Sequence, residues 1–358
     1  MKSRERVLLA LNHEKPDRPP FQASFTPEFK ARLQSDPRAK RLVASDPLGG
    51  DSDYQVERAI GEDMLVSPVG WVNSYYLDTK PYVDEWGVGW DIIPYTTPFG
   101  RGIYTEICKH PLADANKIND YHPPDPNRPE LYEAARKTIR DFKREYWIVG
   151  STVTTIFETA WALRGFNQIL VDMIRNPDLA ETLFDIPYHY HLSAATKLVE
   201  LGVDMIYLGD DMGAQNQMLI SPALWRKYFK PRLAEMIAGL KSINPDLKIA
   251  YHSDGNVEPI IPELIDIGLD VLNPVQPACM DPARIKQKFG DNLCFWGTID
   301  EQFTLPFGTP QDVANEVQLR LETVGYDGTL ILSPTHSVQL DTPLENFWAM
   351  IHAIRDKD

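Results

Sequence analysis

The sequence predicts an α/β protein of the (β/α)8 class, a TIM barrel, with an N-terminal helical arm and a β-hairpin excursion. The first observation is a regular alternation of short apolar runs and amphipathic segments from about residue 147 onward. The second is that these apolar runs end in polar side chains suited to chemistry, as barrel strands do at the active face. The third is the length of 358 residues, because a minimal barrel takes roughly 250 and leaves room for both additions.

The N-terminal part predicts a helical arm and the first two strands. Residues 3–12 have helical periodicity, and the proline-rich stretch 13–20 ends that helix. Thr26, Pro27 and Glu28 supply the cap, the first-turn proline and the early acid of another helix. The expected elements are therefore a helix at 3–12, a strand at 21–25, a helix from 26, a helix at 52–60 and a strand at 63–68.

Residues 70–122 interrupt this order. They carry an aromatic and glycine-rich alternation, WGVGW at 86–90 and RGIYT at 101–105, which is typical of a β-hairpin. We therefore expect an insertion in the barrel here. Since no low-complexity linker separates any part of the chain, residues 1–358 are predicted to form one domain.

The remainder of the chain completes the barrel pattern. The predicted helices cover 130–146, 156–175, 178–201, 222–241, 257–267, 282–289, 310–324 and 343–354. Eight predicted strands lie near Phe21, Met64, Ile148, Ile206, Ile249, Leu272, Phe295 and Ile331.

Composition excludes several classes of protein. Acidic residues outnumber basic ones, 51 against 36, so the formal charge is −15 and a nucleic-acid partner is not expected. Three cysteines without CxxC spacing predict no disulfide framework and a reducing compartment. Because no stretch approaches the roughly 20 apolar residues of a membrane span, we expect a cytoplasmic protein without a membrane partner.

Polar side chains follow most of the predicted strands. A barrel gathers the ends of its strands around one cavity, so these residues are expected on one ring. Each has a simpler alternative as a cap or turn residue, for example Asp254 before Gly255 and Asn256. The ring comprises Gln22, Ser24, Asp63, Ser151, Asp210, Asp211, His252, Asp254, Asn273, Gln276, Asp300 and His336.

Two kinds of chemistry fit this ring. His252 could transfer protons near neutral pH, with the carboxylates as further acids and bases. Alternatively, His252, Asp254 and His336 form a nitrogen and oxygen set suited to a borderline or hard divalent ion. The sequence has no nucleotide-binding glycine motif and no GxSxG elbow, so neither a nucleotide cofactor nor a serine nucleophile is expected.

Several stretches resemble the uroporphyrinogen decarboxylase superfamily. They are RERV at 4–7, NHEKPDRPP at 12–20, GDDMG at 209–213 followed by ISP at 220–222, FWGTID at 295–300 and TPLEN at 342–346. The resemblance covers nearly the whole chain and implies the barrel fold. It implies either a decarboxylase of tetrapyrrole side chains or a zinc-dependent methyltransferase that moves methyl groups between corrinoid proteins and acceptors.

The decarboxylase branch is matched only in part. Its RQAGRY motif holds substrate carboxylates through arginine, whereas the matching stretch 21–29, FQASFTPEF, contains no arginine. Asp63 does match the aspartate that binds pyrrole nitrogens in that branch. Uroporphyrinogen decarboxylation is therefore kept as the alternative activity, a carboxy-lyase.

The methyltransferase branch is also matched in part. Its zinc ligands are a His-x-Cys pair and a later cysteine, where this chain has His252, Asp254 and His336. Zinc accepts histidine and carboxylate ligands. The resemblance thus favours a metal-dependent methyltransferase or demethylase of corrinoid-linked one-carbon metabolism, with zinc bound and the corrinoid supplied by a partner protein.

The predicted roles of the site residues combine the strand-end pattern with the family resemblance. A barrel that only binds a ligand or a corrinoid protein is a second alternative function. A small-molecule substrate is expected, and a homodimer is implied by the family. Glu158, which follows the third strand, is either catalytic or a capping residue. The catalytic set is His252, Asp63, Asp210 and Glu158, the substrate-binding set is Gln22, Ser24, Asp211, Asn273 and Gln276, and the metal set is His252, Asp254 and His336.

Overall fold

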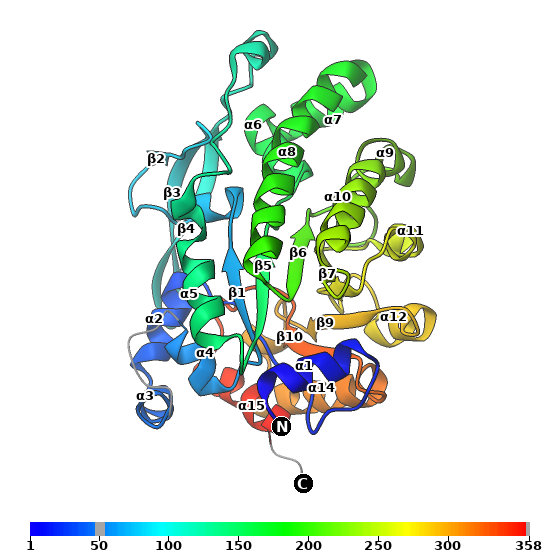
Figure 1. The fold of residues 1–358 in the computed structure, drawn as a ribbon. Coiled ribbons are helices and arrows are strands. Elements are labelled where there is room, and N and C mark those ends of the chain that lie inside the picture. Colours follow the sequence, from blue (N-terminus) through cyan, green and yellow to red (C-terminus); the bar gives the residue numbers. More distant parts are fainter. Residues whose placement is uncertain (47–53, 356–358) are drawn as a thin grey trace.

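Seven parallel strands form a curved sheet at the centre of the molecule (Figure 1). The computed structural model describes residues 1–46 and 54–355. Neighbouring strands follow the chain order β1, β5, β6, β7, β8, β9 and β10, as in a barrel built by successive βα units. Their bounds are β1 (Met64–Pro68), β5 (Trp147–Ser151), β6 (Met205–Gly209), β7 (Lys248–His252), β8 (Val271–Asn273), β9 (Cys294–Ile299) and β10 (Leu330–Pro334).

The strand predicted at 21–25 is reduced to two isolated bridges, one at Phe21 and one between Phe25 and Val338. Phe21 pairs with Leu332 of β10, and the Phe21 carbonyl accepts a 2.8 Å hydrogen bond from the N–H of Asp63. This short segment thus links β10 to the start of β1. A longer strand does not form because Pro20 lacks an N–H donor and α2 begins at Pro27, which corrects the predicted count of eight strands.

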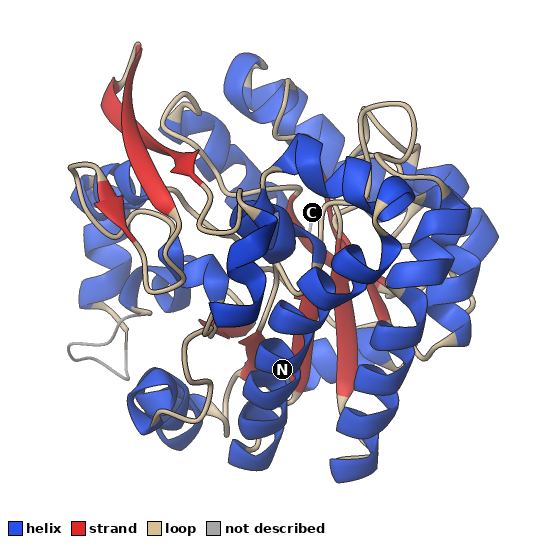
Figure 2. Cartoon of the chain, turned by 90° about the horizontal axis from the view of Figure 1, so that it is seen from above, coloured by secondary structure: helices blue, strands red, loops and turns tan. Residues whose placement is uncertain are grey.

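Helices surround the sheet on its outer side, as the view from above shows (Figure 2). The predicted helix 156–175 is divided at Gly165, whose φ of 100° cannot continue a helix. Of the helix predicted at 52–60, positions 52 and 53 lie outside the described residues. The helices are α1 (Ser3–Leu11), α2 (Pro27–Ser35), α3 (Pro37–Ala44), α4 (Gln55–Ile60), α5 (Glu133–Phe142), α6 (Phe157–Arg164), α7 (Phe166–Arg175), α8 (Pro177–Leu201), α9 (Pro222–Tyr228), α10 (Lys230–Ile243), α11 (Ile261–Asp266), α12 (Pro282–Phe289), α13 (Thr304–Phe307), α14 (Pro310–Thr323) and α15 (Leu344–Arg355).

The segment between β1 and α5 carries a second, antiparallel sheet of three strands. These are β2 (Tyr82–Val83), β3 (Gly89–Thr97) and β4 (Gly100–Lys109). Asp84 organises the turn before β3, because its carboxylate accepts hydrogen bonds from the backbone of Trp86 and Val88 and from the indole of Trp90. The rings of Trp90 and Trp71 stack at 5.5 Å, and Trp71 meets Trp161 of α6 at 6.3 Å, so aromatic packing holds this sheet near the strand ends.

The inside of the curved sheet is filled by alternate strand residues. Side chains two positions apart point to the same face of a strand, and here that face is apolar. The α1 helix packs Val7, Ala10 and Leu11 against the lower end of this inner core (Figure 1). In the described part of the chain, no helix is long and apolar enough to cross a membrane. The inner core consists of Met64, Trp147, Val149, Met205, Ala250, Val271, Cys294, Trp296 and Ile331.

Candidate active site

The carboxyl ends of β6, β7 and β8 bring the central residues of the site together. Parallel pairing sets Gly209 opposite His252 and His252 opposite Asn273. Gly209 is required for this approach, since a Cβ on it would lie 2.3 Å from the His252 carbonyl oxygen. The chain then turns directly into Asp210 and Asp211, and the carboxylate of Asp211 lies beside His252.

Three acceptor groups face one another above these strand ends. His252 Nε2 lies 3.4 Å from Asp211 Oδ1 and 3.7 Å from Asp254 Oδ1. One ligand atom from each of these residues lies within 4.8 Å of the other two. Asp254 Oδ1 is buried and has no hydrogen-bond partner among the described residues. No lysine or arginine in residues 1–46 and 54–355 forms an ion pair with either carboxylate.

The other ring nitrogen of His252 faces a buried hydrogen-bond network. Nδ1 lies 2.7 Å from Asn273 Oδ1 and 2.9 Å from the Tyr207 hydroxyl. That hydroxyl donates to Asn273 Oδ1 at 2.6 Å, and the amide of Asn273 donates to the Trp296 carbonyl at 2.8 Å. The Tyr207 and Trp296 rings pack 4.7 Å apart between centroids. Both polar atoms of Asn273 are therefore occupied by protein, although the sequence predicted a substrate contact.

Asp210 and Glu158 form a second pair of carboxyl groups next to this cluster. Both oxygens of Asp210 accept hydrogen bonds from the N–H of Ile156, and one also accepts from the N–H of Glu158. Asp210 thus anchors the start of α6 to the end of β6. Glu158 Oε2 in turn accepts a 3.2 Å hydrogen bond from the N–H of Asp211.

The electrostatics of the site follow from the excess of carboxylates. Burial raises the pKa of Asp210 to about 7, and burial together with Asp211 and Asp210 raises the pKa of Glu158 well above its usual range. Burial also raises the pKa of Asp254. For His252, burial opposes the charged ring, but the Asp254 and Asp211 carboxylates together outweigh it and raise the pKa. The site therefore favours bound protons or another cation.

The remaining predicted residues lie at the edge of this cluster. Gln276 accepts a 2.6 Å hydrogen bond from the N–H of Gly255 and so supports the loop that carries Asp254. Gln22 accepts from the Trp296 indole at 3.2 Å, while Ser24 is exposed. His336 is exposed, and its ring centroid lies 6.5 Å from that of His252.

The close group of possible ligands overlaps the predicted metal set in His252 and Asp254. Asp211, predicted to bind substrate, takes the place of His336 in the close group with His252 and Asp254. Sequence reasoning also missed Tyr207 and Trp296. The available signal was their position within the strands, since Tyr207 lies two residues before the end of β6 and Trp296 three residues before the end of β9.

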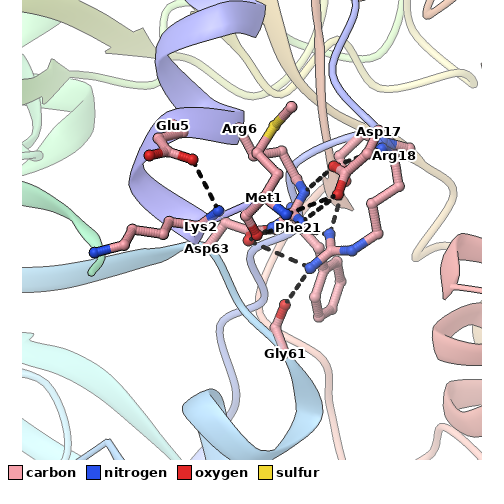
Figure 3. A network of polar contacts seen from close by, with 10 residues as sticks. Met1, Lys2, Glu5, Arg6, Asp17, Arg18, Phe21, Gly61 and Asp63 are labelled. Carbon is pink, nitrogen blue, oxygen red and sulfur yellow. Dashed lines mark hydrogen bonds and ion pairs between the residues drawn. The ribbon is translucent and has the colours of Figure 1, made fainter.

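Asp63 lies at the opposite end of the sheet from the other predicted residues. It directly precedes β1, and its fully buried carboxylate contacts Arg6 Nη1 at 2.6 Å and Arg18 Nη1 at 2.7 Å (Figure 3). It also accepts a 2.9 Å hydrogen bond from the N–H of Phe21. With its oxygens used in this way, Asp63 is placed to join the N-terminal arm to β1, which argues against the catalytic role predicted for it.

Comparison with known proteins agrees with both branches named by the sequence. Residues 95–357 match the family described as Uroporphyrinogen decarboxylase (URO-D). The Methylcobamide:CoM methyltransferase MtaA of Methanosarcina barkeri is 30% identical over 184 residues, which are 51% of this chain and 50% of that protein. The chain thus matches about half the length of this curated relative. The uroporphyrinogen decarboxylase of Psychromonas ingrahamii is 22% identical over 288 residues, covering 74% of this chain and 77% of that protein.

A solved structure shares the fold along the whole chain. A methyltransferase from Methanosarcina mazei superimposes with a TM-score of 0.67 at 23% identity, covering 99% of this chain and 98% of that one. This likeness supports a TIM-barrel-like α/β architecture. The family match covers far more than half of the sequence. The chain therefore belongs to the uroporphyrinogen decarboxylase family.

Proposed function

We propose that this protein is a metal-dependent methyltransferase or demethylase of corrinoid-linked one-carbon metabolism. The observation that carries the proposal is the convergence of His252 Nε2 with the carboxylates of Asp211 and Asp254, which have no lysine or arginine partner among the described residues. Two carboxylates held close together without a lysine or arginine repel one another, so such a cluster favours a cation, either a metal ion or a proton on His252. Sequence similarity to a methylcobamide-dependent methyltransferase supports the same reading.

The donor set fits a divalent metal ion. One imidazole and two carboxylates suit a borderline ion such as zinc, and the unpartnered Asp254 Oδ1 offers a free ligand atom. Asp211, His252 and Asp254 would hold the ion. When bound, it would act as a Lewis acid that lowers the pKa of the acceptor group and makes that group nucleophilic.

The neighbouring residues would bind and move protons. Methyl transfer to an acceptor requires the acceptor to lose a proton, and the reverse reaction requires it to regain one. We assign this proton to Glu158, because burial and the neighbouring Asp211 and Asp210 raise its pKa well above its usual range and it lies beside Asp211. Asp210 would keep Glu158 in place through its hydrogen bonds to the first turn of α6.

The partners follow from the same proposal. A partner protein would supply the methylated corrinoid, and a small molecule would accept or donate the methyl group. The carboxylate Asp254 stands where the methyltransferase branch has a thiolate, so the acceptor need not be a thiol. We also propose that residues 1–358 form one barrel domain with one site. We propose that two such chains form a homodimer.

Uroporphyrinogen decarboxylation is the weaker candidate. Similarity to the Psychromonas ingrahamii enzyme favours it. However, a substrate that carries many carboxylates would meet Glu158, Asp211 and Asp254 at this site, and the stretch 21–29 offers no arginine to hold it.

Metal binding and methyl transfer test the proposal together. Purified protein is analysed for metal, then stripped and titrated with zinc, and demethylation of methylcobalamin in the presence of added small-molecule methyl acceptors, thiols among them, is followed by absorbance. We expect one zinc per chain, its loss in His252→Ala, and its retention in the control His189→Ala, which changes an exposed histidine of α8. Turnover of uroporphyrinogen without metal would overturn the proposal, and binding of a corrinoid without metal or turnover would favour a binding barrel instead.

A further inference from the structure

We propose that Asn273 and Tyr207 are positioning residues that hold His252 in one tautomer, with the proton on Nδ1 and a lone pair on Nε2. This inference rests on the proposed function, because it concerns the nitrogen that would bind the metal. It goes beyond that function because it assigns Asn273 a role in positioning His252 rather than in contacting substrate. It assigns the same role to Tyr207, which the sequence did not single out.

The Trp296 carbonyl determines how the Asn273 amide is oriented. The carbonyl oxygen can only accept a hydrogen bond, and it lies 2.8 Å from the side-chain nitrogen of Asn273. Turning the amide over would place two acceptor oxygens against each other in a buried position, since Asn273 is 5% exposed and Trp296 is 2% exposed. Asn273 Oδ1 therefore points toward His252.

That oxygen in turn determines the proton position on the imidazole. Asn273 Oδ1 lies 2.7 Å from His252 Nδ1 and 2.6 Å from the Tyr207 hydroxyl. Because Oδ1 can only accept, both neighbours must donate to it, and Nδ1 must carry a proton. The Tyr207 hydroxyl donates its hydrogen bond to Asn273 Oδ1. Its oxygen lies 2.9 Å from Nδ1 and can accept a second hydrogen bond from the Nδ1 proton.

The consequence lies on the other side of the ring. A neutral imidazole has one N–H, so the proton on Nδ1 leaves a lone pair on Nε2, which faces Asp211 and Asp254. Hydrogen bonding of the remote ring nitrogen commonly fixes the tautomer of a metal-binding histidine. Packing of Tyr207 against Trp296 restrains the Tyr207 ring and stabilises the arrangement.

Nitrogen NMR of the metal-free protein tests this inference directly. Protein labelled with 15N-histidine is measured in the alkaline range where the ring is neutral, and the His252 signals are assigned from their absence in His252→Ala. We expect the wild-type ring to carry its proton on Nδ1. In Asn273→Leu the acceptor is lost, so we expect the Nε2-protonated form to appear and zinc affinity to fall by roughly 10- to 100-fold.

Two further variants give graded controls. Tyr207→Phe keeps the Asn273 acceptor, so the Nδ1 proton should remain while zinc affinity falls less than in Asn273→Leu. Gln22→Leu removes another buried amide bonded to Trp296 but not to His252, so it should leave the tautomer unchanged. An unchanged Nδ1 proton in Asn273→Leu would overturn the inference. Absence of zinc or methyl transfer in the wild type would count against the proposed function alone, since the tautomer is read without metal.

Discussion

The two ends of the parallel sheet differ in how their carboxylates are paired. At the N-terminal end, Asp63 is surrounded by the guanidinium groups of Arg6 and Arg18 and by a backbone N–H (Figure 3). At the carboxyl end, Asp211 and Asp254 face an imidazole nitrogen and pair with no lysine or arginine of the described chain, although Asp211 Oδ1 accepts a 2.8 Å hydrogen bond from the N–H of Asp254. Asp63 is fully buried, whereas the side chains of Asp211 and Asp254 are 38% and 26% exposed, and only Asp63 is matched by two cationic side chains.

This difference separates stability from binding. Removing a charge from water is costly, and the cost is offset where hydrogen bonds and opposite charges replace the water. Asp63 has such replacements, so it contributes to joining the N-terminal arm to β1. Among the described residues, the acidic cluster at the other end has some backbone hydrogen bonds but no lysine or arginine to offset its charge, which suits a site for a cation. Barrel enzymes commonly divide their two faces in this way.

The largest effect is expected on the free energy of unfolding, at the N-terminal end of the sheet where Asp63 is paired with arginine. Asp63→Asn removes the negative charge and leaves Arg6 and Arg18 facing a neutral amide, which should destabilise the fold by about 3–5 kcal/mol. Urea unfolding measures this loss. Zinc affinity of the folded fraction should not change, because Asp63 lies at the far end of the sheet. A loss below about 1 kcal/mol would remove the distinction between the two ends.

The next largest effect is expected on zinc affinity, at the carboxyl end of the sheet. Asp254→Asn should weaken zinc binding by at least about 100-fold, or about 2.7 kcal/mol, because it removes a proposed ligand. The metal-free variant should be at least as stable as the wild type, since one of several like charges is gone. Chelator competition and urea unfolding measure the two quantities. Asp281→Asn, at the exposed cap of α12, is the matched control and should leave zinc affinity unchanged.

Glu301, near the carboxylate of Asp254, should make the stability of the protein depend on pH. Burial, with Asp341, Asp254 and Asp300 nearby, raises the pKa of Glu301 to about 9. The unfolded chain loses this proton near pH 4.3, so between about pH 4.3 and 9 the folded state binds more protons and stability falls as pH rises. The slope for one proton is at most about 1.4 kcal/mol per pH unit. Unfolding of metal-free Glu301→Gln should show a flatter profile, and an unchanged profile would contradict this assignment.

The smallest effect on the free energy of unfolding is expected for Asp17, a half-exposed residue that pairs with Arg6 at the N-terminal end of the sheet. Asp17 pairs with Arg6 at 2.7 Å, but its side chain is 43% exposed. Water can replace this contact, so Asp17→Asn should cost less than about 1 kcal/mol in urea unfolding. Arg6 keeps Asp63 as its buried partner in that variant. A cost equal to that of Asp63→Asn would mean that burial does not decide the strength of these pairs.

Local pattern accounts for the parts of the fold that the sequence predicted. From residue 147 onward, strand and helix periods alternate, and the strands of the sheet lie near the predicted positions. The same rule placed His252 and Asp254 together, because side chains two apart at a strand end share a face. The strand predicted at 21–25 is not formed as a continuous strand, since this segment makes only two isolated bridges, Phe21 with Leu332 and Phe25 with Val338.

The sequence by itself determined which residue types stand at the strand ends, because periodicity and turn chemistry are local properties. Only the tertiary structure decided which carboxylates are paired. Asp63 meets Arg6 across 57 positions, and Asp211 rather than the exposed His336 joins His252 in the close group. Such partners are set by how distant segments pack, and burial then determines whether an unpaired charge is costly enough to require a ligand.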